Sequence, residues 1–312
     1  MLCRSRGFKV VFHVLATSIL WSAGACDAQR HASSPVDSSQ IAEPLVDLMA
    51  VSWIHGAEDC DAGRRESDYV EWQQVRYQVN TVIFRQNKCS NYEAPFVYLF
   101  IGTEMALLID TGATLDAGAA LVDSIRAVTD LAVIVAHSHG HGDHRLGDDA
   151  FRNTDGMTVV ETGAGAVREF FDFENWPDEP VTLELGAREI ELLPIPGHAT
   201  DDLAFYDPIS KFVVTGDTLY PGRLYIGEWR EYHASISRLA TWVENKSVLY
   251  VMGTHIEMSK TPNVDYPIGT TYQPDEHHLP LSVSDVTILQ EAIANMGIPR
   301  KTRLGSFILW PR

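Results

Sequence analysis

The sequence predicts an α/β protein in which sheets lie between layers of helices. Two observations predict this class: short apolar runs of strand length come first, and strand and helix patterns then alternate, an order that recurs roughly twice. The chain has 312 residues, of which 45% are hydrophobic and 21% are charged. This length and composition allow one large domain or two small ones with a sizeable core.

The first predicted elements lead to a histidine-rich stretch. Residues 96–101 and 106–110 read as two apolar strands around a Gly-Thr turn, and residues 115–128 have the apolar spacing of a helix. Residues 131–136 (LAVIVA) are continuously apolar, as expected for a strand covered on both faces. This strand runs directly into the sequence HSHGHGDH.

The second half repeats the alternation of strands and helices. Strands are expected at 157–160, 181–185, 189–193, 203–206, 212–214 and 248–252. Helices are expected at 165–171, 232–243 and 281–296, the last with Ser282 or Ser284 as its N-cap. Residues 307–310 are expected to close a sheet edge.

The N-terminus has the pattern of a secretory signal peptide at residues 1–25. A basic start is followed by an apolar run that is too short to span a membrane stably, and then by Ala23-Gly24-Ala25, a small-x-small cleavage pattern. Cys26 directly follows, so a membrane-anchored lipoprotein is the alternative to plain secretion. We therefore expect an exported protein, periplasmic or secreted, with residues 26–65 as a stem and N-terminal extension.

Charge and cysteine content restrict the partners and the compartment. The formal net charge of −18 repels phosphate backbones and argues against nucleic acid as a partner. Export to an oxidising compartment favours a disulfide between Cys60 and Cys89, with two unrelated free thiols as the alternative.

The chemistry is concentrated in residues 139–144, HGHGDH. In extended backbone, residues two apart point the same way, so His139 and His141 can grip one metal ion. Asp143 and His144 can turn toward a neighbouring ion. An adventitious histidine tract is the alternative, and it is opposed by three later motifs that each place a ligand after a predicted strand. These motifs are PGH ending at His198, TGDT around Asp217 and GTH ending at His255.

The order DTG, HxHxDH, PGH, GD and GTH resembles the metallo-β-lactamase superfamily over roughly residues 70–260. The resemblance implies an αββα four-layer sandwich of two mixed sheets flanked by helices, with residues 66–312 as the catalytic domain. It implies two zinc ions, with manganese or iron as alternatives. The implied ligands are His139, His141 and His198 for the first ion, Asp143, His144 and His255 for the second, and Asp217 as the bridge. Asp110 resembles the buried aspartate that steadies the histidine loop.

The resemblance further implies a zinc-dependent hydrolase with a small-molecule substrate, in which a bridging hydroxide oriented by Asp143 attacks a carbonyl. The bridging Asp217 favours esters, thioesters or lactones, as in glyoxalase-II-like members, although the chain has only about 55 residues after His255 for the helical domain of glyoxalase II. β-Lactam hydrolysis is the second hypothesis, and an iron-dependent persulfide dioxygenase or a non-catalytic metal-binding module is the third.

Two stretches that follow metal ligands, 219–229 and 262–276, are expected to shape the pocket. They contain the candidate substrate contacts Tyr220, Arg223, Tyr225 and Tyr266, for which simple loop packing is the alternative. Arg223 could hold a carboxylate. His137 is expected to bond locally, and His233 lies in a segment that could line the cleft.

Overall fold

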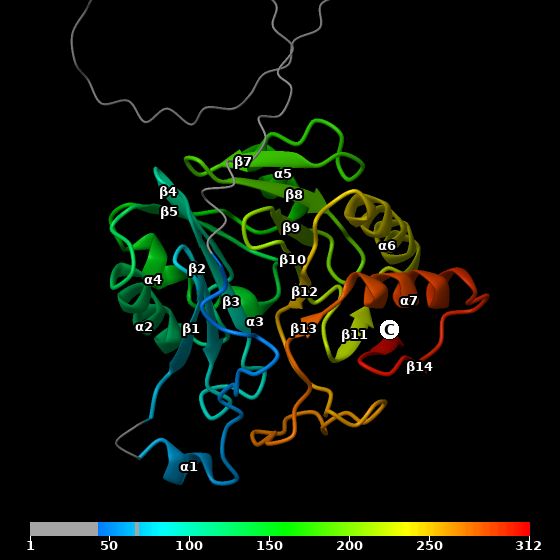
Figure 1. The fold of residues 1–312 in the computed structure, drawn as a ribbon, viewed down its shortest axis with the longest axis horizontal. Coiled ribbons are helices and arrows are strands. Elements are labelled where there is room, and N and C mark those ends of the chain that lie inside the picture. Colours follow the sequence, from blue (N-terminus) through cyan, green and yellow to red (C-terminus); the bar gives the residue numbers. More distant parts are fainter. Residues whose placement is uncertain (1–42, 66–68) are drawn as a thin grey trace, which may run out of the picture.

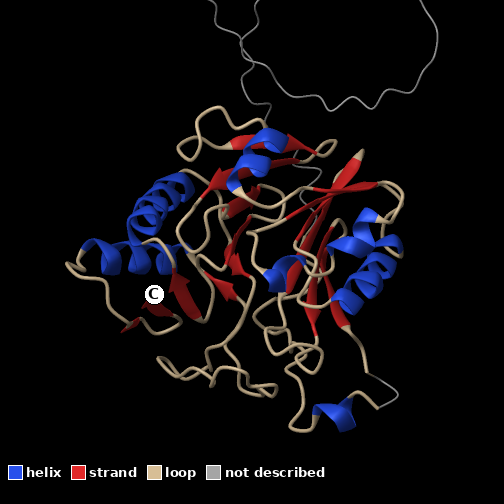
Figure 2. Cartoon of the chain, turned by 180° about the vertical axis from the view of Figure 1, so that it is seen from behind, coloured by secondary structure: helices blue, strands red, loops and turns tan. Residues whose placement is uncertain are grey.

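The structure is a computed structural model that describes residues 43–65 and 69–312. The expected signal peptide and Cys26 lie outside these residues. Two six-stranded sheets form the centre, with α2 and α4 beside the first and α6 and α7 beside the second (Figure 1). Seen from behind, helices again flank the strands on both sides (Figure 2).

The first sheet has the strand order β1-β2-β3-β4-β5-β6 and is mixed. β1 to β4 pair antiparallel, whereas β4, β5 and β6 pair in parallel. The strands are β1 (Trp72–Gln78), β2 (Thr81–Gln86), β3 (Phe96–Ile101), β4 (Met105–Ile109), β5 (Ala132–Ala136) and β6 (Met157–Val159).

The second sheet has the order β13-β12-β10-β9-β8-β7 and is also mixed, because β10 and β12 pair in parallel and the other neighbours antiparallel. Its strands are β7 (Val181–Glu184), β8 (Glu189–Pro194), β9 (Leu203–Asp207), β10 (Phe212–Gly216), β12 (Tyr250–Gly253) and β13 (Pro280–Leu281).

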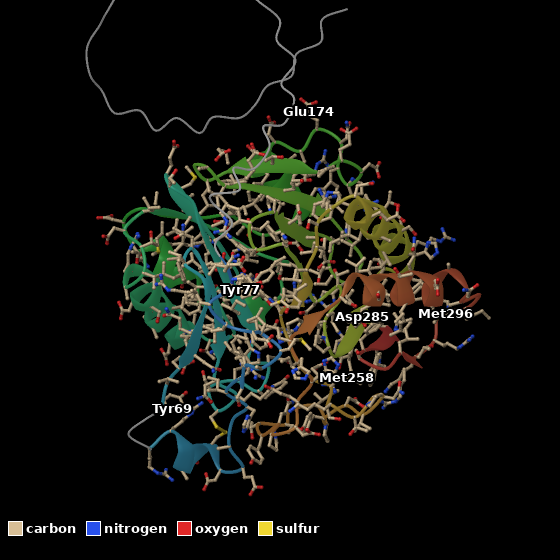
Figure 3. The ribbon with its side chains drawn as sticks, in the orientation of Figure 1. Tyr69, Tyr77, Glu174, Met258, Asp285 and Met296 are labelled. Carbon is tan, nitrogen blue, oxygen red and sulfur yellow. A yellow bond between two sulfur atoms is a disulfide. The ribbon has the colours of Figure 1, made fainter. Side chains whose placement is uncertain are left out.

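Four helices, α2, α5, α6 and α7, lie close to their expected ranges, whereas the short helices α1, α3 and α4 were not predicted. The helices have the bounds α1 (Cys60–Gly63), α2 (Leu115–Arg126), α3 (Gly142–Arg145), α4 (Asp148–Arg152), α5 (Ala164–Phe171), α6 (Trp229–Glu244) and α7 (Val283–Ala294). Ser282 caps α7 in a reciprocal pair with Asp285, whose side chain lies at the start of that helix in Figure 3. None of the helices in the described ranges is long and apolar enough to cross a membrane.

Strand alternation builds three apolar layers. Along β3, Tyr98 and Phe100 face the second sheet, while Val97 and Leu99 face α2. Residues of β8, β9, β10 and β12 complete the layer between the sheets. A third layer joins the outer face of the second sheet to α6 and α7. Three buried layers separate four layers of secondary structure, which is the predicted αββα order.

A third, small sheet was not predicted. It has the order β11-β15-β14 and consists of β11 (Arg223–Ile226), β14 (Thr302–Arg303) and β15 (Ile308–Pro311). The expectation that residues 307–310 close a sheet edge is wrong, because β15 is the central strand of this sheet. It pairs with β11 on one side and β14 on the other.

Residues 43–65, termed here the N-terminal segment, pack on the domain. Leu48 and Trp53 are buried in the layer between the sheets. Cys60 forms a disulfide with Cys89, as predicted. The division of the chain at residue 66 stays a prediction.

A buried arginine joins the two central sheets. The guanidinium of Arg188, between β7 and β8, donates to both carboxylate oxygens of Asp207 at 3.0 and 2.6 Å. It also donates to Thr81 Oγ1 (2.7 Å) in β2 of the other sheet and to the carbonyl of Asn80 (2.6 Å) in the turn that precedes β2. Both charged side chains are only 1% exposed.

We expect Arg188→Met to lower the free energy of unfolding by about 3–5 kcal/mol, because Asp207 is left as a buried, unpaired charge. The double variant Arg188→Met/Asp207→Leu should lose less, since no charge is then stranded. Urea denaturation measures both, with Arg230→Met on the exposed face of α6 as the control. Equal losses in the single and double variants would contradict the argument.

Candidate metal centre

The candidate ligands lie just beyond the ends of strands, at one edge of the two central sheets. Asp110 follows β4, and the loop that contains His139 follows β5. In the second sheet His198, Asp217 and His255 follow β8, β10 and β12. Because β4 pairs in parallel with β5 and β10 with β12, the carboxyl ends of each pair reach the same edge. The topology thereby gathers residues from distant parts of the chain.

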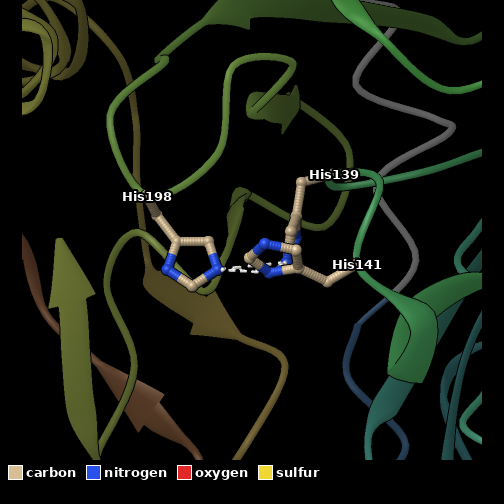
Figure 4. Close-up of side chains that lie close together, drawn as sticks. All are labelled: His139, His141 and His198. Atoms are coloured by element: carbon tan, nitrogen blue, oxygen red, sulfur yellow. Dashed lines mark hydrogen bonds between the residues drawn. The ribbon is translucent and has the colours of Figure 1, made fainter. Parts of the chain in front are cut away.

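Three histidines form the first cluster (Figure 4). His139 Nε2 lies 2.9 Å from His141 Nδ1 and 3.1 Å from His198 Nε2. His198 Nε2 lies 3.0 Å from His141 Nδ1. The three ring nitrogens therefore form a nearly equilateral triangle that faces one point.

Asp143, His144, Asp217 and His255 form the second cluster. The Nε2 atoms of His144 and His255 are 3.3 Å apart. Each lies 3.4 Å from Asp143 Oδ2, and they lie 3.7 and 3.3 Å from Asp217 Oδ1. The four donor atoms thus stand at the corners of a tetrahedron.

Asp217 faces both clusters. Its Oδ1 belongs to the second cluster, while its Oδ2 lies 3.7 Å from His198 Nε2 in the first. The hydroxyl of Thr254 donates to Oδ1 at 2.6 Å and fixes the rotation of the carboxylate. The seven predicted ligands are therefore brought together in the predicted grouping.

Hydrogen bonds to protein acceptors orient three of the five rings, because carboxylates and carbonyls accept from Nδ1 and leave Nε2 directed at the cluster. The pairs are His144 with Asp110 Oδ2 (2.9 Å), His198 with the carbonyl of Tyr225 (2.7 Å) and His255 with the carbonyl of Glu93 (2.9 Å).

Asp110 holds the histidine loop to the first sheet. It is fully buried, and its φ of 72° places it in the left-handed region, which a non-glycine residue adopts only at some cost. Its Oδ1 accepts from the backbone N–H of Ser138 at 2.7 Å, and its Oδ2 accepts from the Ser138 hydroxyl at 2.8 Å. These bonds are the steadying contact that the resemblance implies for Asp110.

The donor sets fit divalent ions. A tetrahedral zinc ion with metal–nitrogen distances of about 2.0–2.1 Å sets its nitrogen ligands about 3.3–3.4 Å apart. The separations of 3.3–3.7 Å in the second cluster match this spacing, and the 2.9–3.1 Å triangle of the first is slightly contracted. Imidazole and carboxylate donors suit zinc, manganese and iron alike.

The electrostatics of the site also call for positive charge. Burial lowers the pKa of His139, and the neighbouring His144 lowers it further. Burial alone would raise the pKa of Asp217, but His255 and His144 bring it well below its usual range. Burial by itself would lower the pKa of His255. The carboxylates of Asp217 and Asp143 outweigh burial and raise this pKa to about 9. In the absence of a bound cation, protonated histidines therefore offset the negative charge of the buried carboxylates.

Several supporting residues escaped the sequence analysis. Ser138 and Thr254 each stand next to a predicted ligand in sequence and bond to Asp110 and Asp217. Asp201 accepts from the N–H of Gly140 at 3.2 Å and from the N–H of Gly163 at 2.6 Å. It thereby links the histidine loop to the start of α5. The adjacency of Ser138 and Thr254 to ligands was the one available signal.

The four predicted substrate contacts lie in or beside the third sheet and mostly contact one another. Arg223 is buried and ion-paired with Glu257 and with Asp265 at 3.1 Å. Tyr220 is buried with its ring against His255, and its hydroxyl donates to the carbonyl of Arg223 at 2.6 Å. Internal partners thus occupy much of the Arg223 guanidinium, and a substrate role for these residues stays a prediction.

Two other histidines considered from the sequence, His137 and His233, lie outside the clusters. His137 Nε2 bonds to Asp148 Oδ1 at 2.9 Å, outside both clusters, so its expected local bonding is confirmed. His233 is exposed on α6 and belongs to neither cluster.

Lys88 is a buried amine close to the site, between the loop that carries Glu93 and residues 267–273. Its Nζ donates to the carbonyl of Tyr92 at 3.0 Å. Burial and the nearby charge of Arg85 lower the pKa of Lys88 to about 7. The carboxylates of Glu276, Glu257 and Glu93 raise this pKa but do not offset the decrease.

We expect Asp110→Asn to weaken metal binding by about 10–100-fold, because His144 loses the carboxylate that fixes its ring. The exposed Asp149→Asn on the neighbouring helix α4 should bind metal like the wild type. Competition with a chromophoric chelator measures the affinities. If the folded Asp110→Asn protein binds metal with unaltered affinity, Asp110 does not orient His144 for metal binding.

The pKa of Lys88 also predicts a pH dependence. Between pH 7 and about 10 the unfolded chain binds a proton at Lys88 that the folded protein does not, so folding stability should rise with pH across this window and level off below pH 7. Lys88→Met should flatten that rise, whereas the exposed Lys260→Met should keep it. Urea denaturation at several pH values tests this, and parallel curves for wild type and Lys88→Met would contradict it.

Among curated proteins, this chain is similar to hydroxyacylglutathione hydrolases. The hydroxyacylglutathione hydrolase of Chromohalobacter salexigens is 32% identical over 114 residues, which are 35% of this chain and 43% of that protein. That of Ruegeria pomeroyi is 34% identical over 106 residues, 33% of this chain and 41% of that protein. The chain thus matches less than half the length of these curated relatives.

A solved metallo-beta-lactamase from Pontibacter korlensis has the same fold, with a TM-score of 0.53 and 18% identity, over 72% of this chain and 100% of that one. The four-layer fold predicted from the sequence is therefore confirmed. The family model described as the metallo-beta-lactamase superfamily matches residues 92–255, which is more than half of the chain and includes all seven clustered candidate ligands. The chain accordingly belongs to the metallo-beta-lactamase superfamily.

Proposed function

We propose that this protein is a metal-dependent hydrolase that holds two divalent ions, zinc in the first instance, and cleaves a small ester, thioester or lactone. The observation that carries the proposal is the placement of Asp217. Its two carboxylate oxygens face two separate donor clusters, as a ligand shared by two ions requires.

His139, His141 and His198 would hold one ion, and Asp143, His144 and His255 the other, with Asp217 shared. When bound, such an ion pair supplies an activated water at neutral pH and polarises a carbonyl oxygen. The chain contains no GxSxG sequence that would supply a serine nucleophile instead.

The side chain of Asp143 is 26% exposed, whereas the other carboxylate of the site, Asp217, is 9% exposed. Asp143 is therefore the carboxylate that a substrate and its attacking water can reach. The pKa of Asp143 lies well below its usual range, because His144 and His255 outweigh the effect of burial. An ionised Asp143 can orient the attacking water, accept its proton at a carboxylate oxygen and pass that proton to the leaving group.

The choice of substrate rests on two supports. A bridging aspartate favours ester, thioester and lactone chemistry over β-lactams by the resemblance described above. The hydroxyacylglutathione hydrolases among the relatives support acyl-group hydrolysis. β-Lactam hydrolysis and a metal-binding module without catalysis are outcomes that the same experiment separates.

We also propose that the protein acts after export, in the periplasm or outside the cell, with or without a lipid anchor at Cys26. The Cys60–Cys89 disulfide supports this placement, because such bonds persist in oxidising compartments.

The purified protein should contain two divalent ions by elemental analysis and should hydrolyse one of a panel of chromogenic esters, thioesters and lactones. Asp143→Asn should lower kcat by about 100-fold or more, since proton transfer contributes on that scale. Asp285→Asn, at a capping residue of α7 that lies outside both clusters, is the matched control. Turnover of β-lactams alone, or no turnover by a fully metal-loaded protein, would refute the assignment.

A further inference from the structure

His255 is the one histidine of the second cluster whose orienting acceptor lies on a loop. His144 is held by Asp110, a side chain at the end of β4 within the first sheet. His255 is held instead by the backbone carbonyl of Glu93, at 2.9 Å, in the connection between β2 and β3. The geometry of the second cluster therefore depends on where that connection lies.

The connection at residues 87–94 is held by short-range hydrogen bonds and by bonds to neighbouring segments, such as those from the N–H of Asn87 to the carbonyl of Glu71 (2.9 Å) and from Asn91 Nδ2 to the carbonyl of Ala113 (3.2 Å). The N–H of Glu93 donates to Asn91 Oδ1 at 2.9 Å, and that of Ala94 donates to the Asn91 carbonyl at 3.1 Å. The N–H of Cys89 donates to Asn87 Oδ1 at 2.9 Å. Because these bonds link successive residues of the turn, a restraint on Cys89 also restrains the backbone at Glu93.

Cys89 carries such a restraint. It is bonded to Cys60 at the start of α1, drawn as a yellow bond beside that helix in Figure 3, and Arg64 also donates to its carbonyl. The N-terminal segment that supplies Cys60 is itself fixed, because Trp53 is buried and its ring lies edge-on to Phe96 at 4.9 Å. The carbonyl of His55 in the same segment accepts from the N–H of Gln273 at 2.9 Å.

We propose that the Cys60–Cys89 disulfide is a positioning element for the second metal ion. It ties residues 87–94 to the anchored N-terminal segment, which keeps the Glu93 carbonyl on His255 Nδ1 and directs His255 Nε2 at Asp143 and Asp217. This inference rests on the proposed two-ion function. Within residues 43–65 and 69–312, the hydrogen bonds of the first cluster go elsewhere: His198 is oriented by the carbonyl of Tyr225, and His139 Nδ1 lies 3.2 Å from Ser138 Oγ.

The test compares metal binding by the wild type and by Cys60→Ser/Cys89→Ser, titrated with Co²⁺ and followed by its visible absorption. The first ion should bind unchanged, while the affinity for the second should fall by about tenfold or more, as for the loss of a ligand-orienting contact. His255→Ala gives the reference spectrum of a protein that lacks the second ion.

Leu289→Ala on α7 is the control for general destabilisation, because this buried residue lies in the layer beneath α6 and α7 and outside both clusters. It should lower the melting temperature and leave both affinities intact. Equal weakening of both ions in the two variants, or unchanged binding of the second ion without the disulfide, would overturn the inference.

Two further results complete the test. Should the double variant not fold, wild-type protein loaded with two Co²⁺ is reduced with a phosphine. The spectrum of the second ion should fade and return on reoxidation. An unchanged spectrum after reduction has released two additional titratable thiols overturns the proposal. Wild type that binds only one ion refutes the two-ion function and this inference together, whereas two ions bound with equal affinities by both proteins refute the inference alone.

Discussion

The site depends above all on the carboxylate of Asp110. It sits at the end of a buried parallel strand, in a left-handed backbone conformation, and binds the backbone and hydroxyl of Ser138 as well as the ring of His144. One fully buried group thereby sets both the course of the histidine loop and the direction of one ligand. The strain at this residue is affordable because the strands around it pack on both faces.

The three apolar layers hold the strands in place at the edge of the sheets where the candidate ligands lie. The candidate ligands follow strands of both sheets, so their mutual distances are set by how the sheets lie against each other. The layer between the sheets and the pairing of Arg188 with Asp207 fix that relation. Donor atoms separated by only 3–4 Å tolerate little sliding, which is why a distant ion pair bears on the geometry of the site.

The sequence was most informative where its patterns were strong. Residues 96–101 are continuously apolar and form β3 with the expected bounds, and the clustered ligands all lie in motifs that glycine flanks. β1 was missed because polar residues such as Gln73 and Gln74 interrupt its alternation on an edge strand. The third sheet escaped because its short strands come from regions far apart in the chain.

Within the site, the sequence could predict ligands but few of the groups that orient them. Two of the orienting acceptors are backbone carbonyls, of Glu93 and Tyr225, and every residue type possesses one. The partners of Arg223 were hidden for a related reason. Glu257 and Asp265 lie 34 and 42 positions away in sequence, and only the folded loops bring them to the guanidinium.

The distribution of exposure over the ligands determines the direction of approach. His139, His144, Asp217 and His255 are buried against the strand ends, whereas His141 and Gly142 reach the solvent and Asp143 is partly open. His141, Asp143 and His198 are the candidate ligands that solvent reaches, so a small molecule would approach the site from the side on which these three lie. The turn at 141–143 therefore carries candidate ligands and is also an exposed part of the site. A Cβ added at Gly142 would meet only Leu146 Cδ1, at 4.0 Å, apart from its chain neighbours, so a side chain there would point into the approach to the cluster.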